Sequence, residues 1–298
     1  MNIFLHGSRR SIEGLTVFDA IFDKLLDLSR GRLSMSLPLY DHLSERMALP
    51  SSVRAVKPGE PLRADLAVSL GGDGTFLRTA QWVGASETPV LGVNAGHLGF
   101  LADMNPDEFL AEDAASLANL KVEPRRLLHV ETSAGLPDDC WPYALNDVAL
   151  LKTDSASMIS VYASIDGRPL TCYQADGLVV ATPTGSTGYN LSVGGPILEP
   201  SVDVVLISPV APHLLAMRPL GVRGDSLLEF TVEARSDTFM LSLDGRSRPF
   251  PAGTTVRVGP APFRILVAQR RVHHFASTLR EKLLWGERPG KQHVEKNF

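Results

Sequence analysis

An aspartate lies inside a glycine-rich turn at residues 71–75, GGDGT, directly after the apolar run LAVSL. The glycines leave backbone N–H groups open to a ligand, and Thr75 could cap a helix that begins at Phe76. A strand that ends in such a turn before a helix N-terminus is typical of an anion site, above all one for phosphate. A tight turn with a solvated aspartate would explain the same residues equally well.

The carboxylate of Asp73 favours chemistry over binding alone. Beside phosphate oxygens a carboxylate is repelled, unless a metal bridges the two or the carboxylate takes a proton, and both situations belong to phosphoryl transfer. The turn matches neither the GxxxxGKS/T loop nor the GxGxxG dinucleotide fingerprint. We therefore expect Asp73 to be catalytic. The predicted phosphate-binding residues are Gly71, Gly72, Gly74 and Thr75.

A second glycine loop follows within residues 89–101, PVLGVNAGHLGFL, again after an apolar run. Because successive parallel strands bring their loops to the same carboxyl edge of a sheet, we expect the two glycine loops to lie close together. Phe100 could line a pocket for a base, although an aromatic residue after a strand is more often part of a core. His97 is interpreted as a solvated loop histidine.

Two polar clusters lie further along the chain. Asn146 and Asp147 interrupt the apolar stretch YALNDVALL, and a neighbouring amide and carboxylate can bind a ribose diol, although a bulge or strand end is an alternative. Residues 176–197, DGLVVATPTGSTGYNLSVGGPI, hold more glycines and hydroxyls than a structural turn needs, which indicates binding. The side chains that stand out there are Asp176, Thr184, Ser186, Thr187 and Tyr189.

The secondary structure expected to position these residues changes once along the chain, from alternating strands and helices to mostly strands. From residue 1 to 128 short apolar runs alternate with helical stretches, which predicts an α/β domain with a parallel sheet. From 129 to 275 short strand-like pieces separated by turn residues predict a β domain. Within 276–298, ASTLREKLLW regains helical spacing and could pack back onto the first domain, followed by a solvated tail.

Composition narrows the class of protein. A chain of 298 residues with 44% hydrophobic and 21% charged residues is folded and long enough for two domains. Its net charge of −4 argues against a nucleic acid or an anionic membrane as partner. Cys140 and Cys172 lack metal-site spacing, so we expect buried, reduced thiols and no resident metal site. Without a membrane span or signal segment, we expect a cytoplasmic location.

The motifs together resemble those of the NAD kinase family. The match is carried by GGDGT, NAGHLGFL, the Asn146–Asp147 pair, the 176–197 block, SPVAPHLLAMRPL and LDGR, from Leu66 onward. The resemblance implies an N-terminal α/β domain, a C-terminal β domain that binds NAD, and transfer of the ATP γ-phosphate to the adenosine ribose 2′-hydroxyl of NAD. It also implies Mg²⁺, or another divalent cation, with ATP, and a homodimer or homotetramer formed through the β domain.

The resemblance assigns roles to individual residues. The family's catalytic aspartate falls on Asp73, and its ribose-binding pair falls on Asn146 and Asp147, where many members have glutamate at the second position. Further NAD-binding positions of the family fall on Asp176, Thr184, Thr187, Gly188 and Tyr189. Beside the resemblance, we expect Gly74 and Phe100 to contact NAD as well. Alanine is usual in the family where this chain has Gly188. Asp244 receives no role, because a hairpin turn explains it equally well.

Two other functions compete with this interpretation. A lipid kinase would share the first glycine loop, but it should also show an apolar groove and a basic or amphipathic membrane-facing segment, which the sequence lacks. A non-catalytic NAD-binding sensor would need the dinucleotide contacts, but it would have no use for Asp73 in a phosphate loop. The intact loop therefore favours the enzyme.

Overall fold

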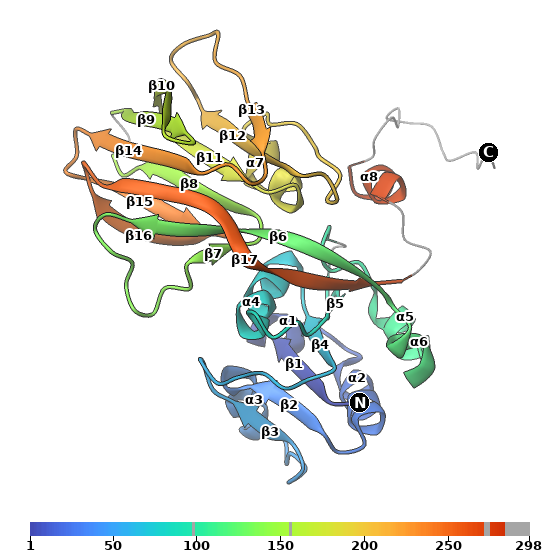
Figure 1. The fold of residues 1–298 in the computed structure, drawn as a ribbon. Helices are drawn as coiled ribbons and strands as arrows, with labels where there is room; N and C mark the ends of the chain where they lie inside the picture. The colour runs from blue at the N-terminus through green and yellow to red at the C-terminus, as the bar shows by residue number, and fades with distance from the viewer. Residues whose placement is uncertain (97–98, 155–156, 271–274, 284–298) are drawn as a thin grey trace, which may run out of the picture. The chain divides into compact units, whose positions relative to one another are not determined.

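The computed structural model describes residues 1–96, 99–154, 157–270 and 275–283 (Figure 1). The chain divides into two compact units. The first unit contains Met1–Trp82, Thr88–Glu123 and the chain from Val267, and the second contains Val83–Glu87 and Pro124–Leu266. The domain boundaries after residues 128 and 275 stay predictions.

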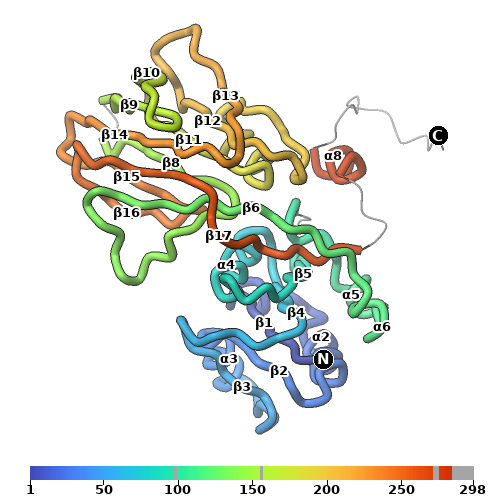
Figure 2. The backbone as a smooth tube through the Cα atoms, viewed as in Figure 1, coloured from blue at the N-terminus to red at the C-terminus, as the bar shows by residue number. Residues whose placement is uncertain are grey.

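The first unit is built on a parallel sheet in the order β5-β4-β1-β2-β3. All residues of β1 and β4 are buried, as expected for strands of a parallel sheet covered on both faces. Figure 2 shows β4 and β5 running side by side, with a register that pairs Leu70 with Val93. The strands are β1 (Ile3–Gly7), β2 (Leu33–Ser36), β3 (Arg54–Val56), β4 (Leu66–Leu70) and β5 (Val90–Val93). The predicted α/β domain with a parallel sheet is confirmed.

Helices follow most strands of this unit. On α2 the apolar side chains recur at helical spacing, so that Phe18, Ile21, Phe22 and Leu25 all reach the core. The helices are α1 (Arg9–Glu13), α2 (Phe18–Ser29), α3 (Leu37–Ser44), α4 (Asp73–Val83), α5 (Pro106–Ala111), α6 (Ala114–Ala118) and α8 (Phe275–Leu283). The predicted C-terminal helix corresponds to α8, which belongs to this unit. The predicted tail, residues 286–298, lies outside the described residues.

The second unit is predominantly β structure. One antiparallel sheet has the order β13-β12-β11-β8-β15-β16, and β10, β9, β14 and the first part of β17 pair in a second. The strands are β6 (Lys121–Thr132), β7 (Tyr143–Ala144), β8 (Asp147–Lys152), β9 (Ile159–Ile165), β10 (Arg168–Ala175), β11 (Gly177–Ala181), β12 (Val204–Val210), β13 (Leu220–Arg223), β14 (Leu228–Ala234), β15 (Thr238–Leu243), β16 (Arg246–Pro251) and β17 (Thr255–Gln269). The predicted β domain is confirmed.

The core of the second unit draws side chains from both of its sheets. Val180 of β11 and Phe239 of β15 are fully buried in one cluster with Val161 of β9 and Phe230 of β14. Two short helical segments, η1 (Thr184–Thr187) and α7 (Tyr189–Ser192), follow β11. The alternating burial along β9 and β14 is the pattern of strands with one face in a core.

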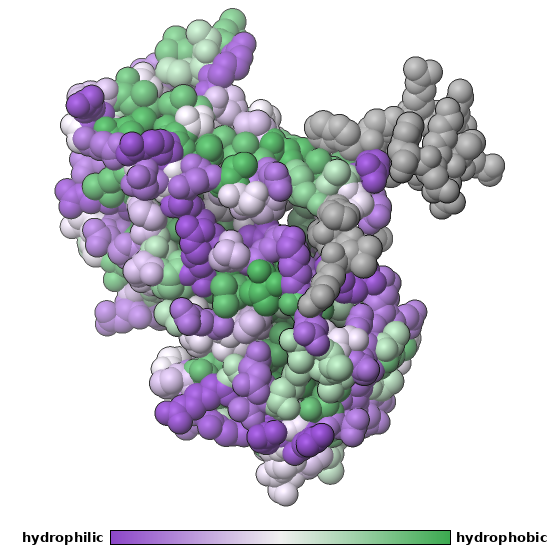
Figure 3. Space-filling model, turned by 45° about the vertical axis from the view of Figure 1, so that its right-hand side comes forward, coloured by the Kyte–Doolittle hydropathy of each residue, from purple (hydrophilic) through white to green (hydrophobic). Residues whose placement is uncertain are grey.

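The structure also shows the distribution of polar residues on one face, the state of the two cysteines and the length of the helices. On the face drawn in Figure 3, hydrophilic and hydrophobic residues are interspersed over the surface. Cys140 and Cys172 are both free, as expected, but each is only half-buried, so the prediction that they are buried is wrong. Among the described residues, no helix is both long and apolar enough to cross a membrane.

Candidate functional site

In the first unit, helix α4 begins three residues earlier than the sequence predicts. The helix begins at Asp73, and the carbonyl of Gly72 accepts from the N–H of Thr75 at 2.9 Å and of Phe76 at 3.1 Å. The prediction that Thr75 caps a helix beginning at Phe76 is therefore wrong. Gly72 closes the first turn with its backbone carbonyl, and Thr75 lies inside that turn, 3% exposed.

The three glycines of the turn have different surroundings. Gly71 is buried at φ +150°, its N–H donates to the Val93 carbonyl at 2.9 Å, and a Cβ there would overlap the Thr75 hydroxyl. Gly72 and Gly74 face open space, since a Cβ at either position would have no neighbouring atom within 4 Å. The first N–H groups of a helix lack partners within it and carry its positive end. This part of the turn can accept a phosphate.

The carboxylate of Asp73 is held by the second glycine loop. Its Oδ2 accepts from the N–H of Phe100 at 2.8 Å, and its Oδ1 accepts from those of Leu101 and Ala102 at 3.0 Å each. Gly99 permits this approach, because a Cβ there would overlap Asp73 Oδ1. The predicted proximity of the two glycine loops is confirmed by these three bonds.

Hydrogen bonds of the Asn94 side chain also stabilise the second glycine loop. This residue is 2% exposed, its Oδ1 accepts from the Gly96 N–H at 2.8 Å, and its Nδ2 donates to the Ala102 carbonyl at 3.1 Å. Phe100 is half-buried and outside the buried core, with its ring facing the ammonium of Lys282 at 5.1 Å from the ring centroid. His97 lies outside the described residues.

In the second unit, the Asn146–Asp147 pair is held by an aspartate distant in sequence. The carboxylate of Asp244 accepts from the N–H groups of Leu145 at 2.8 Å, Asn146 at 2.7 Å and Asp147 at 3.1 Å. The N–H of Asp244 in turn donates to the Asp147 carbonyl at 3.0 Å. The backbone of the predicted ribose-binding pair is therefore fixed by Asp244, which received no role from the sequence.

The hairpin explanation for Asp244 is also correct. Asp244 and Gly245 form the two-residue turn between β15 and β16, with φ of 49° and 78°, the backbone that a type I′ turn requires. The adjacent Arg246 donates to the carbonyls of Trp141 at 2.9 Å and Tyr143 at 2.6 Å. The Asp-Gly turn signal was readable, but no local pattern indicated the partners of the carboxylate.

Asp147 and Asp244 influence each other's ionisation. Burial, and secondarily the charge of Asp244, raises the pKa of Asp147 to about 7, while the N–H of Tyr189 opposes this shift. Burial also raises the pKa of Asp244, against the effect of its three N–H donors and of Arg246. Near neutral pH, Asp147 is present both as a hydrogen-bond donor and as an acceptor.

The loop after β11 lies against the same pair. Thr182, fully buried, donates through its hydroxyl to the Leu145 carbonyl at 2.6 Å and through its N–H to the Asn146 carbonyl at 2.9 Å. A Cβ at Gly185 would overlap the Asn146 backbone, so glycine is required there. Sequence reasoning missed Thr182, although a hydroxyl at the end of an apolar strand was a readable signal.

One atom of the pair lacks a partner. Asn146 Oδ1 is buried and has no hydrogen-bond partner within the described parts of the chain. A Cβ at Gly188 would lie 3.4 Å from Asn146 Nδ2 and 3.5 Å from Asp147 Oδ2, so the usual alanine would touch both side chains. Tyr189 next to it is 36% exposed. Because buried polar atoms are normally satisfied, the free acceptor indicates a ligand position.

Ser186 serves the structure of the loop. Its hydroxyl accepts from the Leu198 N–H at 2.9 Å, and its carbonyl accepts from Asn190 Nδ2 at 3.0 Å. Asn190, fully buried, also accepts from the Ser208 hydroxyl at 2.7 Å. These contacts hold η1 and α7 in place beside the Asn146–Asp147 pair.

Asp176 is separated from the other predicted NAD-binding residues. Asp176 precedes β11, whereas Thr182 and residues 184–189 follow this strand. At the usual rise per residue of a strand, Asp176 and Thr182 are about 20 Å apart. Asp176 forms an ion pair with Lys152 at 2.8 Å. The structure therefore brings Asp147 to the same end of β11 as Thr184, Thr187, Gly188 and Tyr189, and leaves Asp176 at the other.

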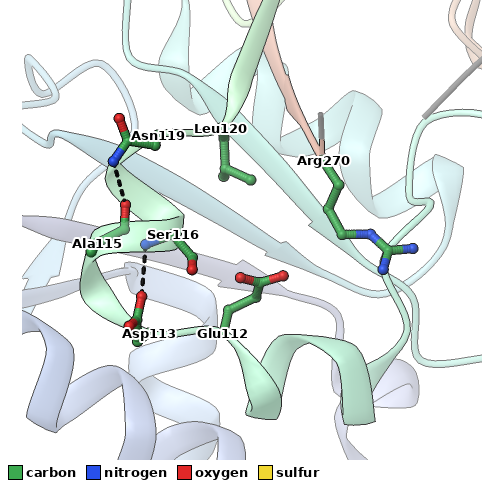
Figure 4. Close-up of a pocket in the computed structure, with 7 residues that line it drawn as sticks. All are labelled: Glu112, Asp113, Ala115, Ser116, Asn119, Leu120 and Arg270. Carbon is green, nitrogen blue, oxygen red and sulfur yellow. Dashed lines mark hydrogen bonds between the residues drawn. The ribbon is translucent and has the colours of Figure 1, made fainter. Parts of the chain in front are cut away.

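A cavity elsewhere in the first unit contains none of the predicted site residues. It lies beside α5 and α6, and Figure 4 shows Arg270 across from Ala115 and Ser116 of α6. The residues lining this cavity are Glu112, Asp113, Ala115, Ser116, Asn119, Leu120 and Arg270. In the described part of the chain, no group of three or more His, Cys, Asp or Glu side chains could hold a metal ion.

Comparisons with known proteins agree with the geometry. Residues 35–119 match the model of the ATP-NAD kinase N-terminal domain, and residues 145–267 match that of the ATP-NAD kinase C-terminal domain. The NAD kinase of Porphyromonas gingivalis is 40% identical over 285 residues, covering 95% of this chain and 98% of the relative. The NAD kinase of Bacteroides fragilis is 46% identical over 228 residues, covering 75% of this chain and 77% of the relative.

Solved structures show the same fold. An NAD kinase from Archaeoglobus fulgidus in complex with ATP aligns with a TM-score of 0.67 and 25% identity, over 96% of this chain and 98% of the other. Yeast NADH kinase complexed with NADH aligns with a TM-score of 0.81 over 99% of this chain and 90% of the other. At 24% identity, the second likeness concerns the fold alone.

Proposed function

The chain belongs to the NAD kinase family. On this premise we propose that its first unit binds the ATP phosphates and that residues 146–189 of its second unit bind NAD. The reaction transfers the γ-phosphate of ATP to the 2′-hydroxyl of the adenosine ribose in NAD and gives NADP. The observation that carries the NAD assignment is the unpartnered, buried Asn146 Oδ1 beside Asp147.

Asn146 and Asp147 are suited to a ribose diol. Asn146 Oδ1 can accept a hydrogen bond from one hydroxyl, and Asp147, whose pKa is raised to about 7, can accept from or donate to the other. Their backbone is held by Asp244, so the pair is fixed before a ligand arrives. The same reasoning supports NAD contacts at Thr184, Thr187, Gly188 and Tyr189.

Asp73 is proposed as the group that orients and deprotonates the 2′-hydroxyl. A carboxylate offers about four acceptor positions, and three of them are occupied by backbone N–H groups. The remaining acceptor position is available to the hydroxyl proton while the N–H groups hold the carboxylate in place. The open space at Gly72 and Gly74, at the start of α4, supports a role in binding the phosphates.

The divalent cation is proposed to arrive as part of the substrate, MgATP. Mg²⁺ is commonly bound through one or two carboxylates together with substrate phosphates. Its chemistry when bound is to offset the negative charge of the phosphates.

Asp176 is proposed to act in the NAD site of a neighbouring subunit. Within one chain it lies about 20 Å from Thr182 along β11. The second unit also exposes apolar side chains that a neighbour could cover, with Leu214 52%, Leu215 89% and Leu227 50% exposed. We propose that these contacts form a closed homodimer or homotetramer. We further propose a cytoplasmic location and no nucleic-acid or membrane partner, in line with the net charge of −4.

Formation of NADP from NAD, ATP and Mg²⁺ by the purified chain tests the activity. Asn146→Ala should weaken NAD binding by about 1–3 kcal/mol, because a ligand donor is left without its acceptor, while ATP binding stays unchanged. Equal weakening of both nucleotides, or of neither, would make Asn146 a structural residue.

Subunit complementation tests the role of Asp176. Mixing Asp73→Asn chains with Asp176→Ala chains should restore part of the activity, because some sites in the hybrid contain both intact residues. A fully active monomer in light scattering at assay concentration would refute the shared site.

A further inference from the structure

Lys282 of α8 carries a buried ammonium without a hydrogen-bond partner. Its Nζ is shielded from solvent and makes no hydrogen bond to any residue that the structure describes. An ammonium has three donors, and burial without acceptors is unfavourable for a charged group. Lysine side chains near a helix end normally reach into water instead. The position of Lys282 therefore requires an explanation beyond helix packing.

The surroundings of Lys282 are the two glycine loops. Its Nζ lies 5.1 Å from the centroid of the Phe100 ring, within the range of a cation–π contact. Burial lowers the pKa of Lys282, and the negative charges of Asp73, Asp103 and Glu281 act in the opposite direction. The ammonium is thus near the carboxylate of the phosphate loop.

Lys282 is not needed to hold Asp73 in place. The Asp73 oxygens already accept from Phe100, Leu101 and Ala102 at 2.8–3.0 Å, and no bond to Lys282 accompanies them among the residues described. The ammonium donors are therefore free for another acceptor. The open Gly72 and Gly74 positions lie beside Asp73 in the same turn, where phosphate oxygens are proposed to bind.

We propose that Lys282 binds a phosphate oxygen of the triphosphate chain of ATP at the glycine turn. The proposal rests on the function given above and extends it to a residue of the C-terminal helix. A positive charge at this place also offsets the repulsion between Asp73 and the phosphates, which a carboxylate in a phosphate loop would otherwise impose. Lys282 contributes one point charge, as lysine does in other phosphate sites.

The test compares Lys282→Met, Lys282→Arg and the control Arg280→Met in the full-length chain. Arg280 lies exposed on the same helix, so the control removes a solvent-exposed cation from α8. The dissociation constant of inorganic triphosphate, measured by calorimetry, and the KM values for ATP and NAD are the readouts. Thermal unfolding of each variant reports whether α8 still packs.

Lys282→Met should raise the KM for ATP and the dissociation constant of triphosphate by roughly 10–100-fold, the usual effect of losing a charged hydrogen bond. The KM for NAD should stay within about twofold, Lys282→Arg should recover part of the affinity, and Arg280→Met should match wild type. Unchanged triphosphate binding by a folded Lys282→Met protein would overturn the proposal. An equal loss for NAD and triphosphate would overturn it too, since that result indicates a structural role.

The two proposals fail differently. If the wild-type chain forms no NADP yet binds triphosphate through Lys282, the proposed function fails and the phosphate contact stands. If the wild-type chain forms NADP and Lys282→Met keeps a normal KM for ATP, the function stands and the role of Lys282 fails.

Discussion

Asp73 in the first unit and Asp244 in the second are held in the same way and differ in their surroundings. Each precedes a glycine, and each accepts from three consecutive backbone N–H groups of a distant segment. Asp73 lies at the start of α4 beside glycines that face open space. Asp244 lies in a hairpin turn and contacts the backbone of the Asn146–Asp147 pair.

The comparison shows that one hydrogen-bonding pattern can serve two purposes. At Asp73 the pattern fixes a side chain that itself faces the proposed phosphate site. At Asp244 it fixes the backbone of other residues, whose side chains face the proposed ribose site. The first aspartate is therefore a candidate catalytic residue, and the second is a positioning residue.

The largest expected effect is that of Asp73→Asn on turnover. The amide cannot take the hydroxyl proton, so kcat should fall by roughly two to four orders of magnitude with little change in NAD affinity. Steady-state kinetics and NAD titration measure the two quantities. Turnover near that of wild type would remove Asp73 from the mechanism and leave it with a holding role like that of Asp244.

Asp244→Ala should reduce the free energy of unfolding by about 3–5 kcal/mol, because three buried N–H groups lose a charged acceptor. The variant should also weaken NAD binding while leaving triphosphate binding intact. Chemical denaturation and calorimetry give both values. Asp237→Ala is the matched control, since Asp237 is exposed before the same strand β15. Wild-type NAD affinity in a folded Asp244→Ala protein would contradict the positioning role.

Gly99→Ala tests the approach of the second loop to Asp73. A Cβ at Gly99 would overlap Asp73 Oδ1, so the loop must shift, at a cost of about 1–3 kcal/mol in stability. Gly96→Ala is its control within the same loop, because a Cβ there meets no atom within 4 Å. Equal stability of the two variants by thermal unfolding would show that the three N–H bonds to Asp73 tolerate displacement.

The smallest effect concerns the pH dependence of stability through Asp147. The folded state raises this pKa from 3.8 to about 7, so between these values the folded protein keeps a proton that the unfolded chain releases. The contribution of Asp147 to the free energy of unfolding therefore falls as the pH rises through this interval. Asp147→Asn should reduce that slope in urea titrations at several pH values. An identical slope in both proteins would argue against the raised pKa.

Much of the molecule was predictable from local patterns. Alternating strands and helices predicted the parallel sheet, and short strand-like pieces separated by turn residues predicted the β unit. These patterns are local, because each element repeats its apolar residues with the period that buries one of its faces. The glycine loops after β4 and β5 predicted a common edge, which the bonds between Asp73 and residues 100–102 confirm. The start of α4 was misplaced, because a backbone carbonyl performs the closure that Thr75 was expected to perform.

The sequence by itself determined the fold class, the two glycine loops and the family, since each depends on residues close together in the chain. Only the tertiary structure decided that Asp244 holds Asn146 and Asp147 across 97–98 residues, and that Asp176 and Thr184 lie at opposite ends of β11. It also placed Lys282 against Phe100. A carboxylate or an ammonium can find its partner in any segment that packs against it, and packing of distant segments leaves no local signature.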